Sequence, residues 1–142
     1  MSVRQVIGGA MSTGTGRLAV SVLTQCDACA VLRVRGELDH ASEEAFLSST
    51  GVVLADGYRY LVLDVAALTF CDSRGLNCLL ALHWLLRRRE GALLLACAGR
   101  RLSDLLRHTG SDKLFPQHAT VSQALASLPA EHRPTWPPLP GR

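Results

Sequence analysis

The spacing of apolar and polar positions changes along the chain, and each change predicts an element. LAVSVLT at 18–24 has the composition of a β-strand, and VLRVRGELD at 31–39 alternates in the way strands do. The CDACA segment at 26–30 lies between them and offers a turn. The pattern therefore predicts a hairpin of two antiparallel strands.

A helix and a buried strand are expected next. ASEEAFLSSTGVVLADG at 41–57 carries acidic residues at its start and a glycine at its end, which is the polarity that a helix favours. YRYLVLDVAAL at 58–68 contains a continuous apolar run from Leu61 to Leu63, typical of a strand that is buried on both faces. We therefore expect this strand in the centre of a sheet.

A second helix and strand follow in the same order. The pattern turns helical from Ser73 to Arg89, Gly91 ends it, and ALLLACA at 92–98 is another apolar run of strand length. At 100° per residue the helix has a wide apolar arc, which we expect in the core and which comprises Leu76, Leu79, Leu80, Leu82, Leu85 and Leu86.

The last part of the pattern predicts two further helices. LSDLLRHTG at 102–110 has helical spacing and a glycine stop, and Thr120 precedes a helix at 121–128 as its N-cap. A short edge strand is expected near 114–115. This order predicts an α/β fold, with a mostly parallel sheet of four to five strands, an antiparallel pair at its N-terminal side and helices packed against it.

The length of 142 residues suits one domain, which we place at 18–128. Residues 1–17 contain repeated Gly, Ser and Thr and are expected to be a flexible arm. Residues 129–142 contain five prolines and are expected to be a flexible tail, because proline interrupts hydrogen-bonded structure.

Composition excludes several classes of function. No apolar run reaches the roughly 18 residues that a membrane span requires, and the first residues lack the apolar region of a secretory signal, so a cytoplasmic protein without a membrane partner is expected. The net charge is +3, and the basic residues are scattered apart from 87–89 and 100–101. With little aromatic interleaving, this pattern does not indicate a nucleic-acid partner.

The cysteines do not form a recognisable ligand set. Cys26 and Cys29 have the spacing of half a zinc site, but no second such pair follows, and a structural site needs four ligands. We therefore interpret them as part of a tight turn and expect neither a metal nor another cofactor.

The segment FCDSRGLN at 70–77 places a serine between a carboxylate and an arginine where a strand meets a helix. A nucleophilic role for Ser73 is poorly supported, because the GxSxG pattern is absent and a base such as His83, His108 or His118 would have to approach in space. A helix cap explains one polar residue, but not several. A phosphate on Ser73 would be tolerated near the positive end of the helix dipole.

These residues carry a resemblance to a known family. GELDHASEEAF at 36–46, LVLDVAALTFCDSRGLN at 61–77 and the apolar strand that ends near Gly99 resemble the STAS domain of bacterial anti-sigma factor antagonists, over about residues 18–127. The positions that match the family's motif are Asp72, Ser73, Gly75 and Leu76, whereas Arg74 stands where a hydroxyl residue is usual.

The resemblance implies a regulatory switch and no enzymatic activity. An unmodified member binds an anti-sigma factor that is also a serine kinase and so frees a sigma factor, phosphorylation ends this binding, and a metal-dependent phosphatase restores it. Ser73 would be the phosphorylation site. The expected partner-binding residues combine this junction with the polar sector of the following helix and comprise Asp72, Arg74, Gly75, Asn77, Ala81, Trp84, Arg88 and Asp39.

Two alternatives stay open at this point. The chain could be a STAS-like module that is never phosphorylated, and that binds a small ligand or serves as a subunit of a larger regulatory assembly. A serine hydrolase is the more distant alternative.

Two interpretations of Trp84 also stay open. The residue is either packed beneath a neighbouring segment or exposed as an anchor for a partner. The second interpretation is considered because tryptophan and arginine are enriched in such anchors.

Overall fold

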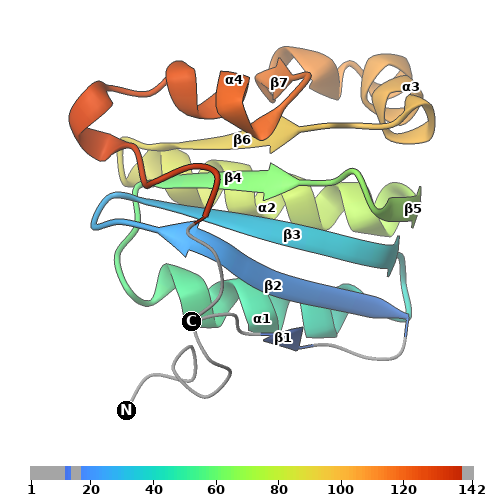
Figure 1. The fold of residues 1–142 in the computed structure, drawn as a ribbon. Coiled ribbons are helices and arrows are strands. Elements are labelled where there is room, and N and C mark those ends of the chain that lie inside the picture. The colour runs from blue at the N-terminus through green and yellow to red at the C-terminus, as the bar shows by residue number, and fades with distance from the viewer. Residues whose placement is uncertain (1–11, 14–16, 139–142) are drawn as a thin grey trace.

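The computed structural model describes residues 12–13 and 17–138, which form a sheet with helices on both faces (Figure 1). The elements, in chain order, are β1 (Ser12–Thr13), β2 (Leu18–Gln25), β3 (Cys29–Leu38), α1 (Glu43–Leu54), β4 (Tyr60–Asp64), β5 (Leu68–Cys71), α2 (Ser73–Arg88), β6 (Ala92–Ala96), α3 (Arg100–Thr109), a 3-10 turn (Ser111–Lys113), β7 (Gln117–His118), α4 (Val121–Ala126) and a second 3-10 turn (Ala130–His132).

The strand order confirms the predicted α/β class. Across the sheet the order is β1-β2-β3-β4-β6-β7, and β5 pairs with the end of β3. The β1–β2 and β2–β3 pairs are antiparallel, whereas the pairs that β3, β4, β6 and β7 form in sequence across the sheet are parallel. The pattern missed β1 and β5, and the expected edge strand near 114–115 is displaced to β7, because Phe115 is buried in the core.

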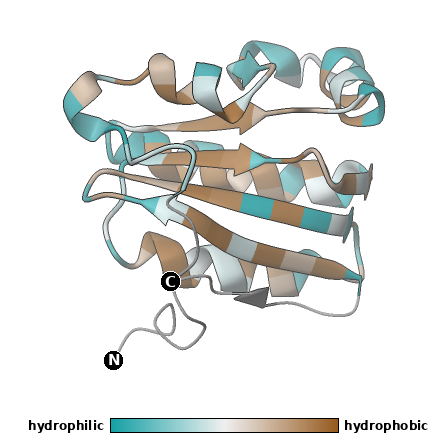
Figure 2. Cartoon of the chain, viewed as in Figure 1, coloured by the Kyte–Doolittle hydropathy of each residue, from teal (hydrophilic) through white to brown (hydrophobic). Residues whose placement is uncertain are grey.

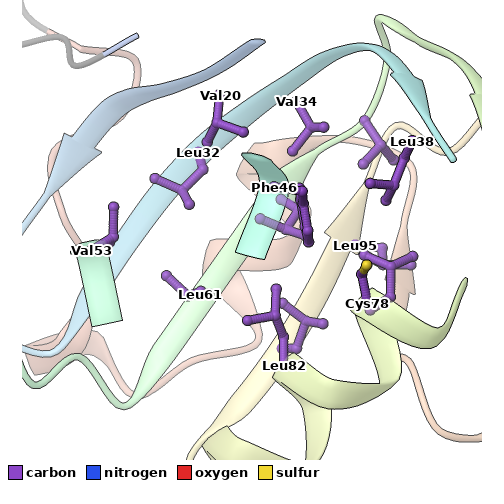
Figure 3. Close-up of a cluster of buried hydrophobic side chains, with 14 of the residues drawn as sticks. Val20, Leu32, Val34, Leu38, Phe46, Val53, Leu61, Cys78, Leu82 and Leu95 are labelled. Carbon is purple, nitrogen blue, oxygen red and sulfur yellow. The ribbon is translucent and has the colours of Figure 1, made fainter. Parts of the chain in front are cut away.

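The larger part of the core lies between the sheet and helices α1, α2 and α3. Figure 3 shows Phe46 of α1 and Leu82 of α2 in one cluster with Leu61 and Leu95 of the strands. One residue of the expected arc is misplaced: Leu85 is 36% exposed, because it lies at the edge of that arc. The other leucines of the arc are buried or half-buried.

The opposite face of the sheet is covered by α4 and by residues 129–138, which cross it in front in Figure 1. The expectation of a flexible tail is wrong for this stretch. Pro134 is buried, Trp136 packs against the cluster that contains Val62, and the Arg133 side chain donates to the Leu128 carbonyl at 2.9 Å. Covering this apolar face removes the rings of Pro134 and Trp136 from water, which stabilises the packed stretch even though its prolines interrupt helices and strands. Residues 139–142 lie outside the described residues.

Most of the expected N-terminal arm also lies outside the described residues, which include only 12–13 and Arg17 of it. Figure 2 shows β6 and most of β4 as hydrophobic, with a hydrophilic end of β4 at Asp64, whereas β3 has hydrophilic bands toward its carboxyl end, where Arg33 and Arg35 are exposed. Among the described helices, none combines the length and the apolar character that crossing a bilayer requires.

Candidate phosphorylation and docking site

Asp72 holds the junction between β5 and α2. It is the N-cap of α2, and its side chain accepts a hydrogen bond from the Gly75 amide at 2.9 Å. Its own amide donates to the Leu38 carbonyl at 3.3 Å, which anchors the cap to the end of β3. The capping role expected at this junction thus belongs to Asp72, and Ser73 is the first residue of the helix.

Ser73 is exposed at the start of this 16-residue helix. Among the described residues, nothing hydrogen-bonds to its hydroxyl, and the amides of Ser73 and Arg74 have no acceptor. A helix start of this kind presents unpaired N–H groups and the positive end of the dipole, both of which favour an anion. The geometry therefore accommodates a phosphate on Ser73.

Gly75 is required by the close approach of α2 to β3. A Cβ at this position would lie 2.3 Å from the Leu38 carbonyl oxygen and 2.9 Å from the Cys71 sulfur. The residue is buried. Its place in the expected partner-binding set is therefore explained by packing inside the domain, and it offers no surface to a partner.

Asp39 is also committed to contacts within the domain. Its Oδ1 accepts from the amides of Ala41 at 2.9 Å and Ser42 at 3.2 Å, and its Oδ2 forms an ion pair with Arg17. Only 7% of the residue is exposed. This carboxylate shapes the entry into α1, so its inclusion in the expected docking surface does not fit its burial.

Arg74 bridges the first turns of α1 and α2. Its Nε lies 3.6 Å from a Glu43 carboxylate oxygen, and one terminal nitrogen lies 3.3 Å from His40 Nδ1. His40 and Glu43 are neighbours of the site that reasoning from the sequence did not single out. Both stand in the GELDHASEEAF segment, so the quoted motif contained a signal that could have identified them.

The outward side of α2 brings the other expected residues together. Asn77, Ala81, Trp84 and Arg88 are all exposed, and at 100° per residue they share one sector with Ser73. Trp84 is 52% exposed, which is unusual for so large an apolar side chain. We call Ser73 and these four residues the α2 face.

His83 lies beneath Trp84 and faces the interior. The two rings meet edge to face with centroids 4.7 Å apart, and the Phe115 ring lies 5.4 Å from His83 on the inner side. Burial, with a contribution from Arg87, lowers the pKa of His83. The imidazole thus forms part of the packed interior, as its position among leucines predicted.

The described residues show no catalytic constellation around Ser73. Its hydroxyl has no hydrogen bond to a histidine there, and burial and Asp72 raise the pKa of Cys71 to about 12, which keeps that thiol protonated. Cys26 and Cys29 close a turn in which the Cys26 amide donates to the Cys29 carbonyl at 2.8 Å, as predicted. Within residues 12–13 and 17–138, no group of three or more potential metal ligands is found.

Comparison with known protein families identifies the family of this chain. The family model for the STAS domain matches residues 21–124. The crystal structure of an anti-sigma factor antagonist from Mycobacterium paratuberculosis is 31% identical, with a TM-score of 0.67 over 76% of this chain and 92% of that chain.

Two other solved proteins share the fold at lower identity. Unphosphorylated SpoIIAA, an anti-sigma factor antagonist, is 20% identical, with a TM-score of 0.62 over 72% of this chain and 89% of that chain. The phosphorylated form of Bacillus SpoIIAA matches this chain with a TM-score of 0.57. The murine anion transporter Slc26a9 is 16% identical, with a TM-score of 0.62 over 72% of this chain but only 18% of that chain.

Proposed function

The chain belongs to the STAS domain family, and we propose that it acts as an anti-sigma factor antagonist controlled by phosphorylation of Ser73. In this proposal the unphosphorylated form binds an anti-sigma factor serine kinase and so releases a sigma factor. A metal-dependent phosphatase removes the phosphate again. The catalytic groups belong to these partners, and the chain is their ligand and substrate.

One observation carries the proposal: an exposed serine at the capped start of α2, on the same face as Trp84 and Arg88. The similarity to an anti-sigma factor antagonist over 92% of its length supports the same conclusion. The Asp72 cap restrains the backbone at the start of α2, so a kinase would meet Ser73 as the exposed first residue of a formed helix.

The location of Ser73 explains how a phosphate would end binding. Phosphorylation adds up to about two negative charges beside Asp72. If the kinase covers the α2 face, these charges would be buried against it, and an unpaired buried charge costs several kcal/mol. Binding would therefore be lost without a change of fold.

Mass spectrometry after incubation with a candidate anti-sigma factor kinase and ATP tests the modification. We expect a single phosphate, which Ser73→Ala abolishes and Ser48→Ala leaves in place. Ser48 is a suitable control because it is an exposed serine on the neighbouring helix α1. Undiminished labelling of Ser73→Ala would contradict the proposal.

Calorimetric titration with the same kinase tests the switch. The unmodified chain should bind and the phosphorylated chain should not. Ser73→Asp should weaken binding less than phosphate does, because it adds one charge on a shorter side chain. Equal binding of the modified and unmodified chains would separate phosphorylation from partner release and refute the switch.

A second candidate is a STAS module that is not phosphorylated and serves as a subunit of a larger assembly or binds a small ligand. Two observations favour it: the fold matches a part of a transporter, and Arg74 replaces the usual hydroxyl residue. No labelling of Ser73 by any kinase of this class, with the fold intact, would be the expected result for this candidate.

A further inference from the structure

The α2 face extends to only one side of Ser73. Asn77, Ala81, Trp84 and Arg88 all follow Ser73 along the helix, and at 1.5 Å per residue Trp84 lies about 16 Å from it along the axis. A kinase that contacted this face alone would hold Ser73 at the end of its contact surface. The segment on the other side of Ser73 is β5, which the docking site described so far does not include.

Phosphoryl transfer to Ser73 makes a stricter demand than binding does. The Ser73 oxygen attacks the γ-phosphorus of ATP, and the bond from that phosphorus to the β,γ-bridging oxygen breaks. ADP leaves with that oxygen, and the hydroxyl proton passes to a base of the kinase. Attack requires the reacting atoms to be held about 3–3.5 Å apart. Contacts on both sides of the serine restrain it better than contacts on one side.

Phe70 is an exposed aromatic side chain on the β5 side of Ser73. Five large apolar side chains are exposed among the described residues, and the other four lie on α1 and α2. Phe70 lies three residues before Ser73, and 40% of it is exposed. The adjacent Cys71 packs against the core, so the alternation of a strand turns Phe70 outward.

The backbone from Phe70 to Ser73 is restrained at both ends. β5 pairs with the end of β3, where Phe70 is opposite Glu37 (Figure 1). The Asp72 amide donates to the Leu38 carbonyl at 3.3 Å, and Asp72 caps the helix that Ser73 begins. An aromatic ring on a restrained backbone is an effective anchor, because it loses little conformational entropy on binding.

We propose that Phe70 is a positioning residue for phosphoryl transfer, whose ring docks on the kinase beside its active site and aligns the Ser73 hydroxyl with ATP. This inference rests on the proposed function, since it requires a kinase that phosphorylates Ser73. Trp84 then contributes mainly to the affinity of the complex, and Phe70 contributes mainly to the rate of transfer within it. The partner that fits is a kinase with an apolar pocket at the mouth of its active site, on the side that meets β5.

Steady-state kinetics of phosphate incorporation with a candidate anti-sigma factor kinase, and calorimetry with ADP in place of ATP, separate the two roles. Phe70→Ala should lower kcat by about tenfold or more, because the serine is less well aligned, and should change the affinity by less than about threefold. Trp84→Ala should show the opposite pattern, with a loss of affinity and a nearly unchanged kcat. Phe70→Tyr should retain most of the rate, because it keeps an aromatic ring in the same place.

Val52→Ala is the matched control, because Val52 is 37% exposed near the end of α1, away from Ser73, and both constants should be unchanged. Thermal denaturation should show that each variant is folded. Phe70→Thr should behave like Phe70→Ala and keeps the strand if alanine loosens it, because threonine favours strands.

The outcomes distinguish this inference from the function on which it rests. If Phe70→Ala and Phe70→Thr were phosphorylated with the kcat of the unmodified chain, the positioning role would be overturned and the proposed function would stand. If the unmodified chain were not labelled at Ser73, both would be refuted.

Discussion

At the scale of single residues, two glycines in helices have opposite requirements. Gly75 has no room for a side chain, since a Cβ would lie 2.3 Å from the Leu38 carbonyl oxygen, whereas Gly51 faces open space. Gly75→Ala should therefore lower the free energy of unfolding by about 2 kcal/mol, as overpacking against backbone does. Gly51→Ala should raise it by about 0.5–1 kcal/mol, because alanine favours the helix.

Urea denaturation of both variants measures these changes. The pair controls for helix propensity, because each variant makes the same chemical substitution in a helix. If Gly75→Ala proved as stable as the unmodified chain, the close approach of α2 to β3 would be refuted.

At the scale of elements, side-chain caps define where α2 and α4 begin. The Asp72 carboxylate accepts from the Gly75 amide, and the Thr120 hydroxyl accepts from the Gln123 amide at 3.0 Å. Asp72→Ala and Thr120→Ala should each cost about 1 kcal/mol of unfolding free energy. Only Asp72→Ala should also slow the phosphorylation of Ser73, because that cap alone positions the serine.

Thermal denaturation and the initial rate of phosphate incorporation separate the two effects. Asp72→Asn retains an acceptor for the Gly75 amide but removes the charge, so it should keep most of the stability. If Thr120→Ala slowed the phosphorylation of Ser73 as much as Asp72→Ala does, general destabilisation would explain the slower rate. That result would count against a positioning role for the Asp72 cap.

At the scale of the whole molecule, the two tryptophans lie on opposite sides of the sheet. Trp136 packs against the cluster beneath α4, whereas Trp84 is half exposed on the outward side of α2. Trp136→Ala should lower the free energy of unfolding by about 2 kcal/mol and leave kinase binding unchanged, because it uncovers apolar surface away from the α2 face. Trp84→Ala should weaken binding by roughly 2 kcal/mol at little cost in stability.

Calorimetry against the kinase and urea denaturation compare the two variants. Normal binding by Trp84→Ala together with a large loss of stability would make Trp84 a structural residue and would remove the α2 face as the docking site.

Local pattern by itself determined the class of fold and the place of the candidate site at the start of a helix. The apolar run from Leu61 to Leu63, the helical spacing after Ser73 and the Thr120 cap all depend on residues close together in the chain. Hydrophobic period and capping are properties of a single segment, so they can be deduced from it. The exposed sector of α2 can likewise be deduced from the rotation of 100° per residue along a helix.

Tertiary structure alone decided features that need two distant segments. β5 exists as a strand because it pairs with the end of β3, and the burial of Asp39 depends on its contact with Arg17. Residues 129–138 are ordered because Trp136 finds an apolar face to cover. Whether these contacts form depends on how the folded elements bring the partners together, and the free energy of burying a side chain is set by surfaces that no local pattern contains.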